Sequence, residues 1–337
     1  MAEIVLGIGT SHGPMLSTPW ENWGARVPFD QGATHDFRGG KYSFEELVAL
    51  RRDEGLAAEF TKDKWRERHA ACNDALIRLA DAFEAAKPDA AVIVGNDQRE
   101  LFSEFNTPAI SVFYGETIEN RPRTPEQIAN LPPGVAVAER GHAPPEDAVY
   151  PGYPALGLHI INSLMDDGFD VSTMKHLPEG TGYVNGVPHA YGFVYRRIMR
   201  DMPPPSVPVV LNTFYPPNQP SAARCIAFGH ALGKAIRDWP ESARVAVIAS
   251  GGLSHFVIDE ALDRRVLAAF EARDEAALAA IPENLYQSGT SEIKNWLPVA
   301  SLMWEAGLEM ELVDYVPCYR SEAGTGNAMG FALWRQP

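Results

Sequence analysis

Three stretches of the sequence carry polar, potentially catalytic side chains directly after short apolar runs. These stretches are Thr10–His12, Asn96–Gln98 and Ser250–His255. In open α/β sheets, sites form at the carboxyl ends of strands, so we expect the three stretches to meet at one edge of a sheet. His12 and His255 suit two kinds of chemistry there, because an imidazole can move a proton near neutral pH or bind a metal ion.

A third histidine, His189, lies in the run Pro188–Gly192 before another apolar stretch. A single loop histidine is more often held by a local carbonyl than used in catalysis. A purely structural role is less expected for histidines that follow strands in glycine- and serine-rich turns. The candidate catalytic residues are therefore His12, His189 and His255. Ser254 beside His255 is not expected to form a nucleophile pair, because adjacent side chains on a turn usually diverge.

Other common catalytic signatures are absent from the sequence. Gly7–Gly9 lacks the spacing of a dinucleotide fingerprint, and there is no GxxxxGK[ST] loop and no HExxH pair. Gly251–His255 fails the GxSxG pattern because a histidine takes the last position. The cysteines are far apart and form no CxxC pair, so we expect neither a disulfide framework nor a zinc knuckle.

Short apolar runs alternate with segments of helical periodicity, which is typical of an α/β domain. The expected strands are Glu3–Gly9, Asp89–Gly95, Ala109–Tyr114, Phe169–Met174, Pro208–Phe214, Arg244–Ser250, Leu312–Tyr319 and Ala328–Trp334. The expected helices are Lys64–Ala86, Tyr153–Asp166, Ser221–Asp238, Asp259–Arg273 and Asn295–Ala306. We predict a single domain over residues 1–337, with a central mixed sheet flanked by helices and a site at the strand carboxyl ends.

Two segments have no regular pattern. Residues 15–62 are interpreted as a lid-like excursion over the site rather than a separate domain. The aromatic residues of this excursion suit either a hydrophobic lid or simple packing onto the core; they are Trp20, Trp23, Phe29, Phe37 and Tyr42. Residues 120–150 are rich in proline, glycine and charge, so we predict a surface loop with a solvated His142.

Composition and charge exclude several partners. The 337 residues include 29 Lys and Arg against 44 Asp and Glu, a formal net charge of -15, and an acidic chain without a basic cluster is not expected to bind nucleic acid. No apolar run approaches the roughly 20 residues that span a bilayer. The first residues, MAEIVLGIGTSH, have neither the basic start nor the cleavage site of a secretory signal, so we expect a cytoplasmic protein that does not enter a membrane.

Several longer motifs follow one another along most of the chain. They are the strand ending in Thr-Ser-His12-Gly-Pro, then Val92–Asp97, Val209–Thr213 followed by Tyr215-Pro216-Pro217, Ser250–His255, Gly289–Glu292 before a tryptophan-containing helix, and Gly326–Gly330. In this order they resemble the class III extradiol ring-cleavage dioxygenase superfamily, of the protocatechuate 4,5-dioxygenase β-subunit type. Ser250–His255 is the most specific of the matches.

The resemblance implies a non-haem Fe(II) held by two histidines and one glutamate, with positions open for a catechol and O2. His12 matches the first iron ligand, His255 the acid–base histidine, and His189 a pocket histidine that hydrogen-bonds the substrate. Three further residues beside these motifs are predicted to bind substrate: Asn96, Asp97 and Ser254.

Two positions depart from the pattern of that superfamily. Gln98 stands where the second iron-binding histidine is expected, and an amide oxygen is a poorer ligand for Fe(II) than imidazole. The glutamate ligand is expected at the start of the helix after His255, where the best register gives Ala261 and a shift of one residue gives Glu260. The predicted iron ligands are therefore His12, Gln98 and Glu260.

Three functions fit these observations. The first is extradiol cleavage of a catechol-like or phenolic aromatic, with Fe(II) and O2. The second is a metal-independent lyase or hydrolase in which the same histidines act as acids and bases on a phenolic or enolisable substrate. The third is a non-catalytic protein that binds an aromatic ligand, which the titratable pocket residues argue against. Related proteins pair with a small subunit or form homodimers, and by that analogy we expect a homo-oligomer.

Overall fold

The computed structural model describes residues 1–131, 135–179 and 186–336. The strands of the main sheet are β1 (Glu3–Thr10), β4 (Ala90–Gly95), β5 (Ile110–Phe113), β8 (Ser172–Met174), β9 (Ser206–Leu211), β10 (Arg244–Ser250), β11 (His255–Val257), β12 (Glu309–Tyr319) and β13 (Thr325–Arg335). Two hairpins lie outside it, β2 (His35–Phe37) with β3 (Gly40–Tyr42) and β6 (Thr117–Asn120) with β7 (Ala148–Pro151).

The α-helices of the described chain are α1 (Val27–Gln31), α2 (Phe44–Leu50), α3 (Lys62–Ala86), α4 (Pro125–Ala129), α5 (Pro154–Asp166), α6 (His189–Phe193), α7 (Ala222–Arg237), α8 (Glu260–Glu271), α9 (Glu275–Ala279) and α10 (Ile293–Glu305). Each predicted strand and helix is present, with its ends moved by a few residues. No helix within the described ranges combines the length and the apolar character that crossing a membrane requires.

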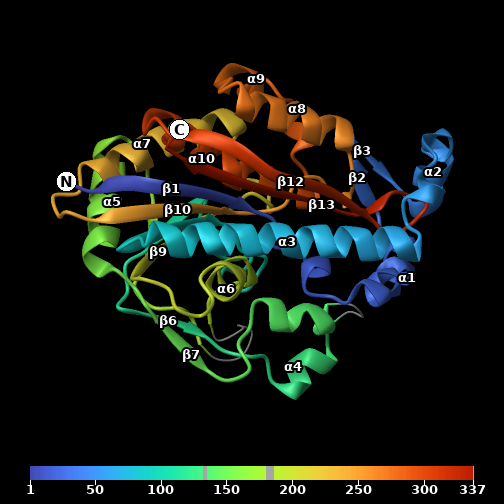
Figure 1. The fold of residues 1–337 in the computed structure, drawn as a ribbon, viewed down its shortest axis with the longest axis horizontal. Helices are drawn as coiled ribbons and strands as arrows, with labels where there is room; N and C mark the ends of the chain where they lie inside the picture. The colour runs from blue at the N-terminus through green and yellow to red at the C-terminus, as the bar shows by residue number, and fades with distance from the viewer. Residues whose placement is uncertain (132–134, 180–185, 337) are drawn as a thin grey trace.

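The main sheet has the strand order β11-β13-β1-β10-β4-β9-β5-β8, with β12 paired to β13. Strands β1, β10, β4 and β9 are parallel neighbours, whereas β13 runs antiparallel to β1 and β5 antiparallel to β9. Figure 1 shows α3 along one side of this sheet and α7 and α10 on the other. The predicted α/β fold with a central mixed sheet is therefore confirmed.

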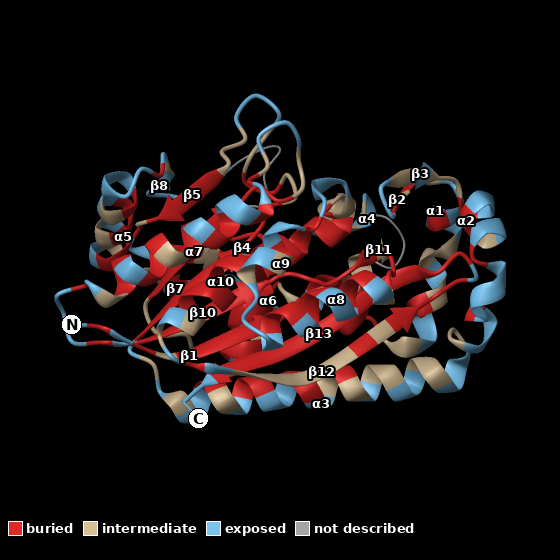
Figure 2. Cartoon of the chain, turned by 90° about the horizontal axis from the view of Figure 1, so that it is seen from above, coloured by how far each residue is buried: buried red, intermediate tan, exposed pale blue. Residues whose placement is uncertain are grey.

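Burial on both faces of the sheet explains why its central strands are unbroken apolar runs rather than alternating ones. In β4, Val92 and Val94 belong to one core with residues of α5, α7, α8 and α10, whereas Ala91 and Ile93 belong to a second core with residues of α3 and α6. Figure 2 shows the sheet as a buried layer between helices with exposed outer faces. This double burial holds the strand ends rigidly.

The parallel strands bring the predicted site segments to one edge. Thr10, at the end of β1, is in register with Ser250, at the end of β10, and the segment that begins with Asn96 directly follows β4. Strand β11 pairs antiparallel with β13, so that His255 lies opposite Asn327. The residues of the candidate site thus project from neighbouring, well-anchored elements.

The excursion at residues 15–62 folds as short helices and the β2–β3 hairpin between β1 and α3. Trp23 is buried in the same core as α3 residues, and Phe37 packs with Phe44 and Leu47 in a small separate cluster. None of the five aromatic residues named for a hydrophobic lid lines the main cavity described below. The excursion therefore uses its described aromatic side chains mainly for packing.

The prediction of a surface loop over residues 120–150 is wrong in part. Thr124 caps α4 in a capping box with Gln127, and Pro125 at the first helical position favours the helix. Further along, Arg140 donates a hydrogen bond to the carbonyl of Ser17 over 3.1 Å. The described part of this segment is therefore a small lobe that packs against the excursion.

Candidate active site

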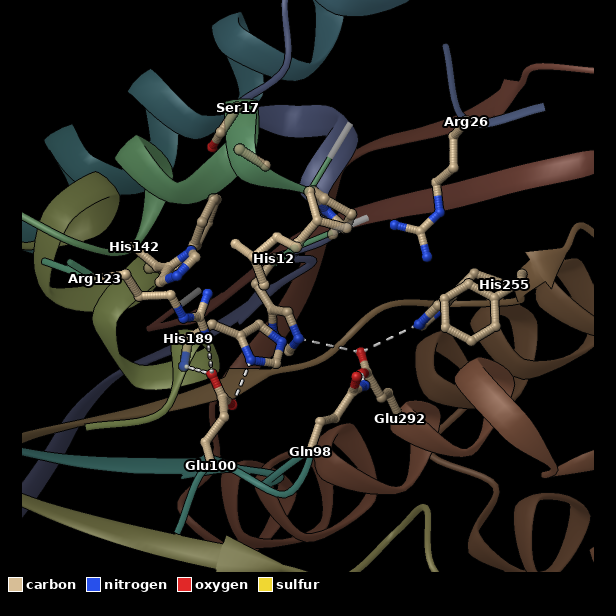
Figure 3. Close-up of a pocket in the computed structure, with 17 residues that line it drawn as sticks. His12, Ser17, Arg26, Gln98, Glu100, Arg123, His142, His189, His255 and Glu292 are labelled. Carbon is tan, nitrogen blue, oxygen red and sulfur yellow. Dashed lines mark hydrogen bonds and ion pairs between the residues drawn. The ribbon is translucent and has the colours of Figure 1, made fainter. Parts of the chain in front are cut away.

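A cavity of about 220 Å³ opens at the carboxyl ends of β1 and β4, beside β11. Its polar lining includes His12, Gln98, His189, His255 and Glu292, and Figure 3 shows these side chains converging on one space. A cavity of roughly 150 Å³ is enough to hold benzene, so this one suits a single substituted aromatic ring. The structure thus brings the three predicted histidines and Gln98 together, and adds a carboxylate at their centre.

Glu292 is that carboxylate, at the end of the turn Ser288–Glu292 that leads into α10. The residue is only 2% exposed. One of its oxygens, Oε2, lies 3.4 Å from Nε2 of His12 and 3.5 Å from Nε2 of His255. Burial alone would raise the pKa of Glu292, but the two histidines outweigh it and hold that pKa well below its usual range. Glu292 is therefore a buried anion.

Neutral donors fix the orientation of this anion without neutralising it. The side-chain amides of Gln98 and Asn96 donate to its Oε1 over 3.0 and 3.2 Å, and the backbone N–H of Gly252 donates to its Oε2 over 2.8 Å. A buried carboxylate is costly unless an opposite charge accompanies it. In the described structure that charge can come only from a proton on the neighbouring histidines or from a bound cation.

Hydrogen bonding on the far side of the ring sets the tautomer of His12. Ser250 Oγ donates its hydrogen to the carbonyl of Ala190 over 2.7 Å, so it must accept from Nδ1 of His12, which lies 2.9 Å away. The neutral imidazole then has its lone pair on Nε2, the atom that faces Glu292. Burial, the largest influence, lowers the pKa of His12 despite the nearby carboxylate, which favours this neutral form.

His255 is oriented in a similar way but differs in its affinity for a proton. Its Nδ1 lies 2.7 Å from the carbonyl of Leu253, which leaves Nε2 facing the cavity. Burial alone would lower the pKa of His255, but Glu292 and the Leu253 carbonyl raise it overall. Gly289 makes room for the ring, because a Cβ there would lie 2.2 Å from its Cδ2. Of the two histidines beside Glu292, His255 is thus the better proton carrier.

His189 forms a pair with a carboxylate that the sequence did not reveal, Glu100. Nδ1 of His189 lies 2.6 Å from Oε2 of Glu100, and its backbone N–H donates to Oε1 over 3.1 Å. Burial opposes both charges, but the pair outweighs it, so that the pKa of Glu100 falls to about 2 and the pKa of His189 is raised. A charged His189 presents an Nε2–H donor to the cavity, where its ring contacts that of His12 at 4.8 Å between centroids.

The described part of the lobe within residues 120–150 lines the cavity on the side of His189. Arg123 donates to Glu139 over 2.7 Å and lies 3.7 Å from Glu100, so its charge is compensated within the lobe. His142 lines the same cavity and contacts the His189 ring at 5.9 Å between centroids. The prediction that His142 is solvated is therefore wrong, because the lobe folds inward against the site.

Glu260 does not join the site, and its predicted place among the iron ligands is not supported by its position. It begins α8, does not line the cavity, and binds Arg264 and the hydroxyl of Tyr319 over 3.0 and 3.1 Å. The carboxylate beside His12 and His255 comes instead from the turn before α10. Glu260 and Ala261 both stand in the first turn of a helix whose amino end faces Tyr319 rather than His12.

The three residues predicted to bind substrate lie behind the cavity wall, and none of them lines it. Asn96 bonds to Glu292 and to Asn295. Asp97 accepts backbone hydrogen bonds from Glu100, Leu101 and Phe102, and so shapes the loop that carries Gln98. Ser254 donates to Asp263 over 2.6 Å. The structure assigns these polar groups to positioning, because their hydrogen bonds are already made within the protein.

Asp263 is expected to make the protein less stable as the pH rises towards neutrality. Burial, partly offset by hydrogen bonds from Ser254 and Tyr315, raises its pKa from 3.8 to about 7. Between about pH 4 and pH 7 the folded protein therefore holds a proton on Asp263 that the unfolded chain has lost. The contribution of this group to the free energy of unfolding, on the order of a few kcal/mol, is fully present below about pH 4 and is lost by about pH 7. Denaturant unfolding across pH 4–8 measures it.

The matched variant for this pH dependence is Asp263→Asn, which cannot ionise. Asp97 also titrates in this window, since burial raises its pKa to about 6, so only the difference between wild type and variant reports on Asp263. The variant is expected to lose a hydrogen bond and some stability at every pH, but to show a shallower decline between pH 4 and 7. An identical decline would show that Asp263 stays ionised throughout.

Sequence reasoning missed three residues of the site: Glu292, Glu100 and Arg26. Glu292 stands in the motif Gly289–Glu292, where a charged residue immediately before an apolar, tryptophan-containing helix was an available signal. Glu100 lies two residues after Gln98 in the same polar segment. Arg26 lies in the excursion, where no spacing relates it to the strand ends, and its place in the cavity follows only from the fold.

Comparisons with known proteins identify a family for this chain. The family described as the catalytic LigB subunit of aromatic ring-opening dioxygenase matches residues 67–316, a range that includes Gln98, His189, His255 and Glu292. A gallate dioxygenase from Pseudomonas putida is 33% identical over 124 residues. That alignment covers 37% of this chain and 35% of the relative, so the chain matches only about a third of the length of this curated protein.

Fe(II) is best held in such a pocket by two histidines and one carboxylate. Among the described residues, no group of three His, Cys, Asp or Glu side chains is placed to hold a metal ion. The lone pair of His12 Nε2 and the anionic Glu292 nevertheless face one another across 3.4 Å, as two ligands of one ion do, and Gln98 stands beside them. The set therefore fits a divalent cation with an amide as third ligand, more weakly held than by two histidines and a carboxylate.

Proposed function

Because the chain belongs to the family of catalytic LigB subunits of aromatic ring-opening dioxygenases, we propose that it cleaves a catechol-like aromatic ring in the extradiol manner, with O2 as co-substrate. The observation that carries this proposal is the buried Glu292 carboxylate between Nε2 of His12 and Nε2 of His255. That arrangement combines a metal-binding imidazole, an anion and a proton carrier at one end of a cavity that suits a single aromatic ring.

Each residue has a distinct role in this proposal. With the hydroxyl groups of the ring towards Glu292, His255 accepts a phenolic proton at Nε2 and returns it as the ring opens. His189, held by Glu100, donates its Nε2–H to a substrate oxygen. His12, Glu292 and Gln98 would hold Fe(II), which when bound supplies the electrons that activate O2. The apolar wall, which includes Phe193 and Phe256, excludes water from the ring.

Replacement of His255 by alanine is expected to reduce turnover by roughly 10²–10⁴-fold, the usual contribution of a positioned acid–base group. Oxygen uptake and the absorbance of the ring-opened product, measured with a panel of catechols, give the rate. The fold should persist, because the side-chain hydrogen bond to Leu253 is local and Glu292 keeps its donors from Gln98, Asn96 and Gly252. His176→Ala, at an exposed position, is the control and should match the wild type. Full activity of folded His255→Ala protein would remove His255 from the mechanism.

The test of the proposed function is the metal content and oxygen consumption of the purified protein. Anaerobic reconstitution with Fe(II) should give up to one iron per chain and oxygen uptake that depends on a catechol. Addition of a chelator should abolish both. Turnover of a catechol without oxygen consumption would contradict the proposal.

One observation favours a second function, metal-independent acid–base catalysis on a phenolic or enolisable substrate. The side-chain amide of Gln98 donates an N–H hydrogen bond to Glu292. An imidazole that bound a metal from this position would direct its lone pair to the metal and would not make this hydrogen bond. With a proton in place of iron, His12, His189 and His255 would act as acids and bases in a lyase or hydrolase reaction. Turnover that survives both chelator and anaerobic conditions would support this function over the first.

A further inference from the structure

Arg26 is a cation in the cavity wall for which the described residues supply no ion pair. It ends the 3-10 helix Trp20–Arg26 in the excursion and lines the same cavity as His255 and Glu292. Figure 3 shows its guanidinium group reaching into that space, with no interaction drawn to it. Its Nε is buried and has no hydrogen-bond partner among the described residues. A buried donor left unpaired costs stability, so such a group often has a function.

The carboxylate whose charge acts on Arg26, that of Asp30, is already engaged by another arginine. Asp30 receives two hydrogen bonds from Arg320, of 2.6 and 2.9 Å, and a third from Thr325 of 2.7 Å. Both Asp30 and Arg320 are 2% exposed, so this bidentate pair is complete and shielded from water. The hydrogen bonds of Asp30 thus go to Arg320 and Thr325, and the described residues leave the positive charge of Arg26 without an ion pair.

Aromatic side chains hold the Arg26 guanidinium in place rather than neutralise it. The group lies 5.3 Å from the ring centroid of Phe29 and 5.9 Å from that of Phe256, the residue that follows His255. Burial, followed by the charge of Arg320, lowers the pKa of Arg26 to about 10, so it remains charged near neutral pH. A desolvated, oriented guanidinium is a strong receptor for a planar carboxylate, which it can bind through two parallel hydrogen bonds.

The other charged groups of the cavity lining are compensated inside the protein. Arg123 is paired with Glu139, and Glu100 with His189. The anion Glu292 lies at the end of the cavity where His12 and His255 meet. A ligand that places hydroxyl groups beside Glu292 and a negative charge beside Arg26 would therefore supply the counter-charge that the described lining does not give Arg26.

We propose that Arg26 is a specificity-determining residue that binds an anionic substituent of the aromatic substrate and so turns the hydroxyl-bearing edge of the ring towards His255 and Glu292. This inference rests on the proposed function for the identity of the ring, but the binding of the anionic substituent does not depend on turnover. The residue belongs to the excursion, which thereby contributes a substrate contact as well as packing.

The experiment compares two probes that differ only in the carboxylate, 3,4-dihydroxybenzoate and catechol. Their dissociation constants are measured anaerobically by calorimetry for the wild type, Arg26→Met, Arg26→Lys and the control Arg66→Met, which alters an exposed arginine on α3.

The wild type should bind the acid more tightly than catechol. Arg26→Met should weaken binding of the acid by roughly 10–100-fold, as expected for a lost charge-assisted hydrogen bond, and change binding of catechol by less than about 3-fold. Arg26→Lys should fall between them, and Arg66→Met should match the wild type.

Several results would overturn this proposal. The first is that Arg26→Met weakens the binding of both probes equally, and the second is that it changes the binding of neither. The third is that the wild type does not bind the acid more tightly than catechol. Thermal unfolding shows whether Arg26→Met is folded, which we expect because the described residues offer this side chain no hydrogen bond to lose. If the acid binds through Arg26 but neither probe is turned over with oxygen uptake, the proposed function fails while the role of Arg26 stands.

Discussion

Replacement of Glu292 by glutamine is expected to abolish both metal binding and turnover. The variant keeps the size of the side chain but removes the anion that His12 and His255 share. Without it the ligand positions hold one imidazole and two neutral amides, which are too weak a set to hold Fe(II). The loss should also be complete in the metal-independent alternative, because the carboxylate holds the protonated form of His255. Metal content, oxygen uptake and product absorbance measure the effect.

The matched control for this experiment is Glu260→Gln. It makes the same chemical change at the carboxylate that a one-residue shift of the sequence register selects, which lies on α8 beside Arg264. That variant should keep its metal and its activity. Glu292→Gln should lose about 1–3 kcal/mol of stability, because its NH2 group must face one of the donors that now serve the carboxylate. An active Glu292→Gln protein, or an inactive Glu260→Gln protein, would contradict the site described above.

Replacement of Gln98 by histidine is expected to raise the affinity for Fe(II) by roughly 10–100-fold, the scale on which single metal-site changes act. The variant would supply a second imidazole beside His12 and Glu292 and so complete the preferred set of two histidines and one carboxylate. Anaerobic competition with a chromophoric chelator at fixed pH measures the change, and fixed pH matters because imidazole ligands compete with protons.

Gln98→Met serves as the control, because it removes the amide and adds only a soft thioether that Fe(II) does not favour. It should not raise the affinity. If Gln98→His leaves iron binding unchanged, position 98 does not face the metal and the amide acts only as a donor to Glu292. The second function would then be favoured over ring cleavage with O2.

Much of the fold follows from periodicity in the sequence. The strands Asp89–Gly95 and Arg244–Ser250 are predictable because burial on both faces leaves only apolar residues in their interiors, Ala90–Val94 and Val245–Ala249. The position of His12 just beyond β1 follows for the same reason, since a polar residue after such a run lies at the edge of the sheet. His255 was expected at the end of a core strand, but it begins the short strand β11, which pairs with β13. Residues 120–150 were mispredicted because their proline and glycine content resembles that of a loop, although Thr124 is a helix cap.

The partners of the histidines were less predictable from the sequence. Glu260 and Glu292 both stand near the start of a helix, and no local pattern distinguishes the one that meets His12 from the one that meets Tyr319. The pairing of His189 with Glu100 joins positions 89 residues apart. Such contacts depend on where α6 and α10 pack against the sheet, and a single sequence does not encode that placement locally.

The bond from Ser250 to the carbonyl of Ala190 has a consequence for how the cavity meets a ligand. That carbonyl belongs to α6, so the choice of which His12 nitrogen carries hydrogen is made by the buried backbone before any ligand arrives. A ligand entering the cavity finds the lone pair of Nε2 already presented and need not reorient the ring. The entropic cost of ordering the His12 ring is therefore met during folding and does not reduce the free energy of ligand binding. More of that binding free energy can then hold the aromatic ring in the geometry of reaction.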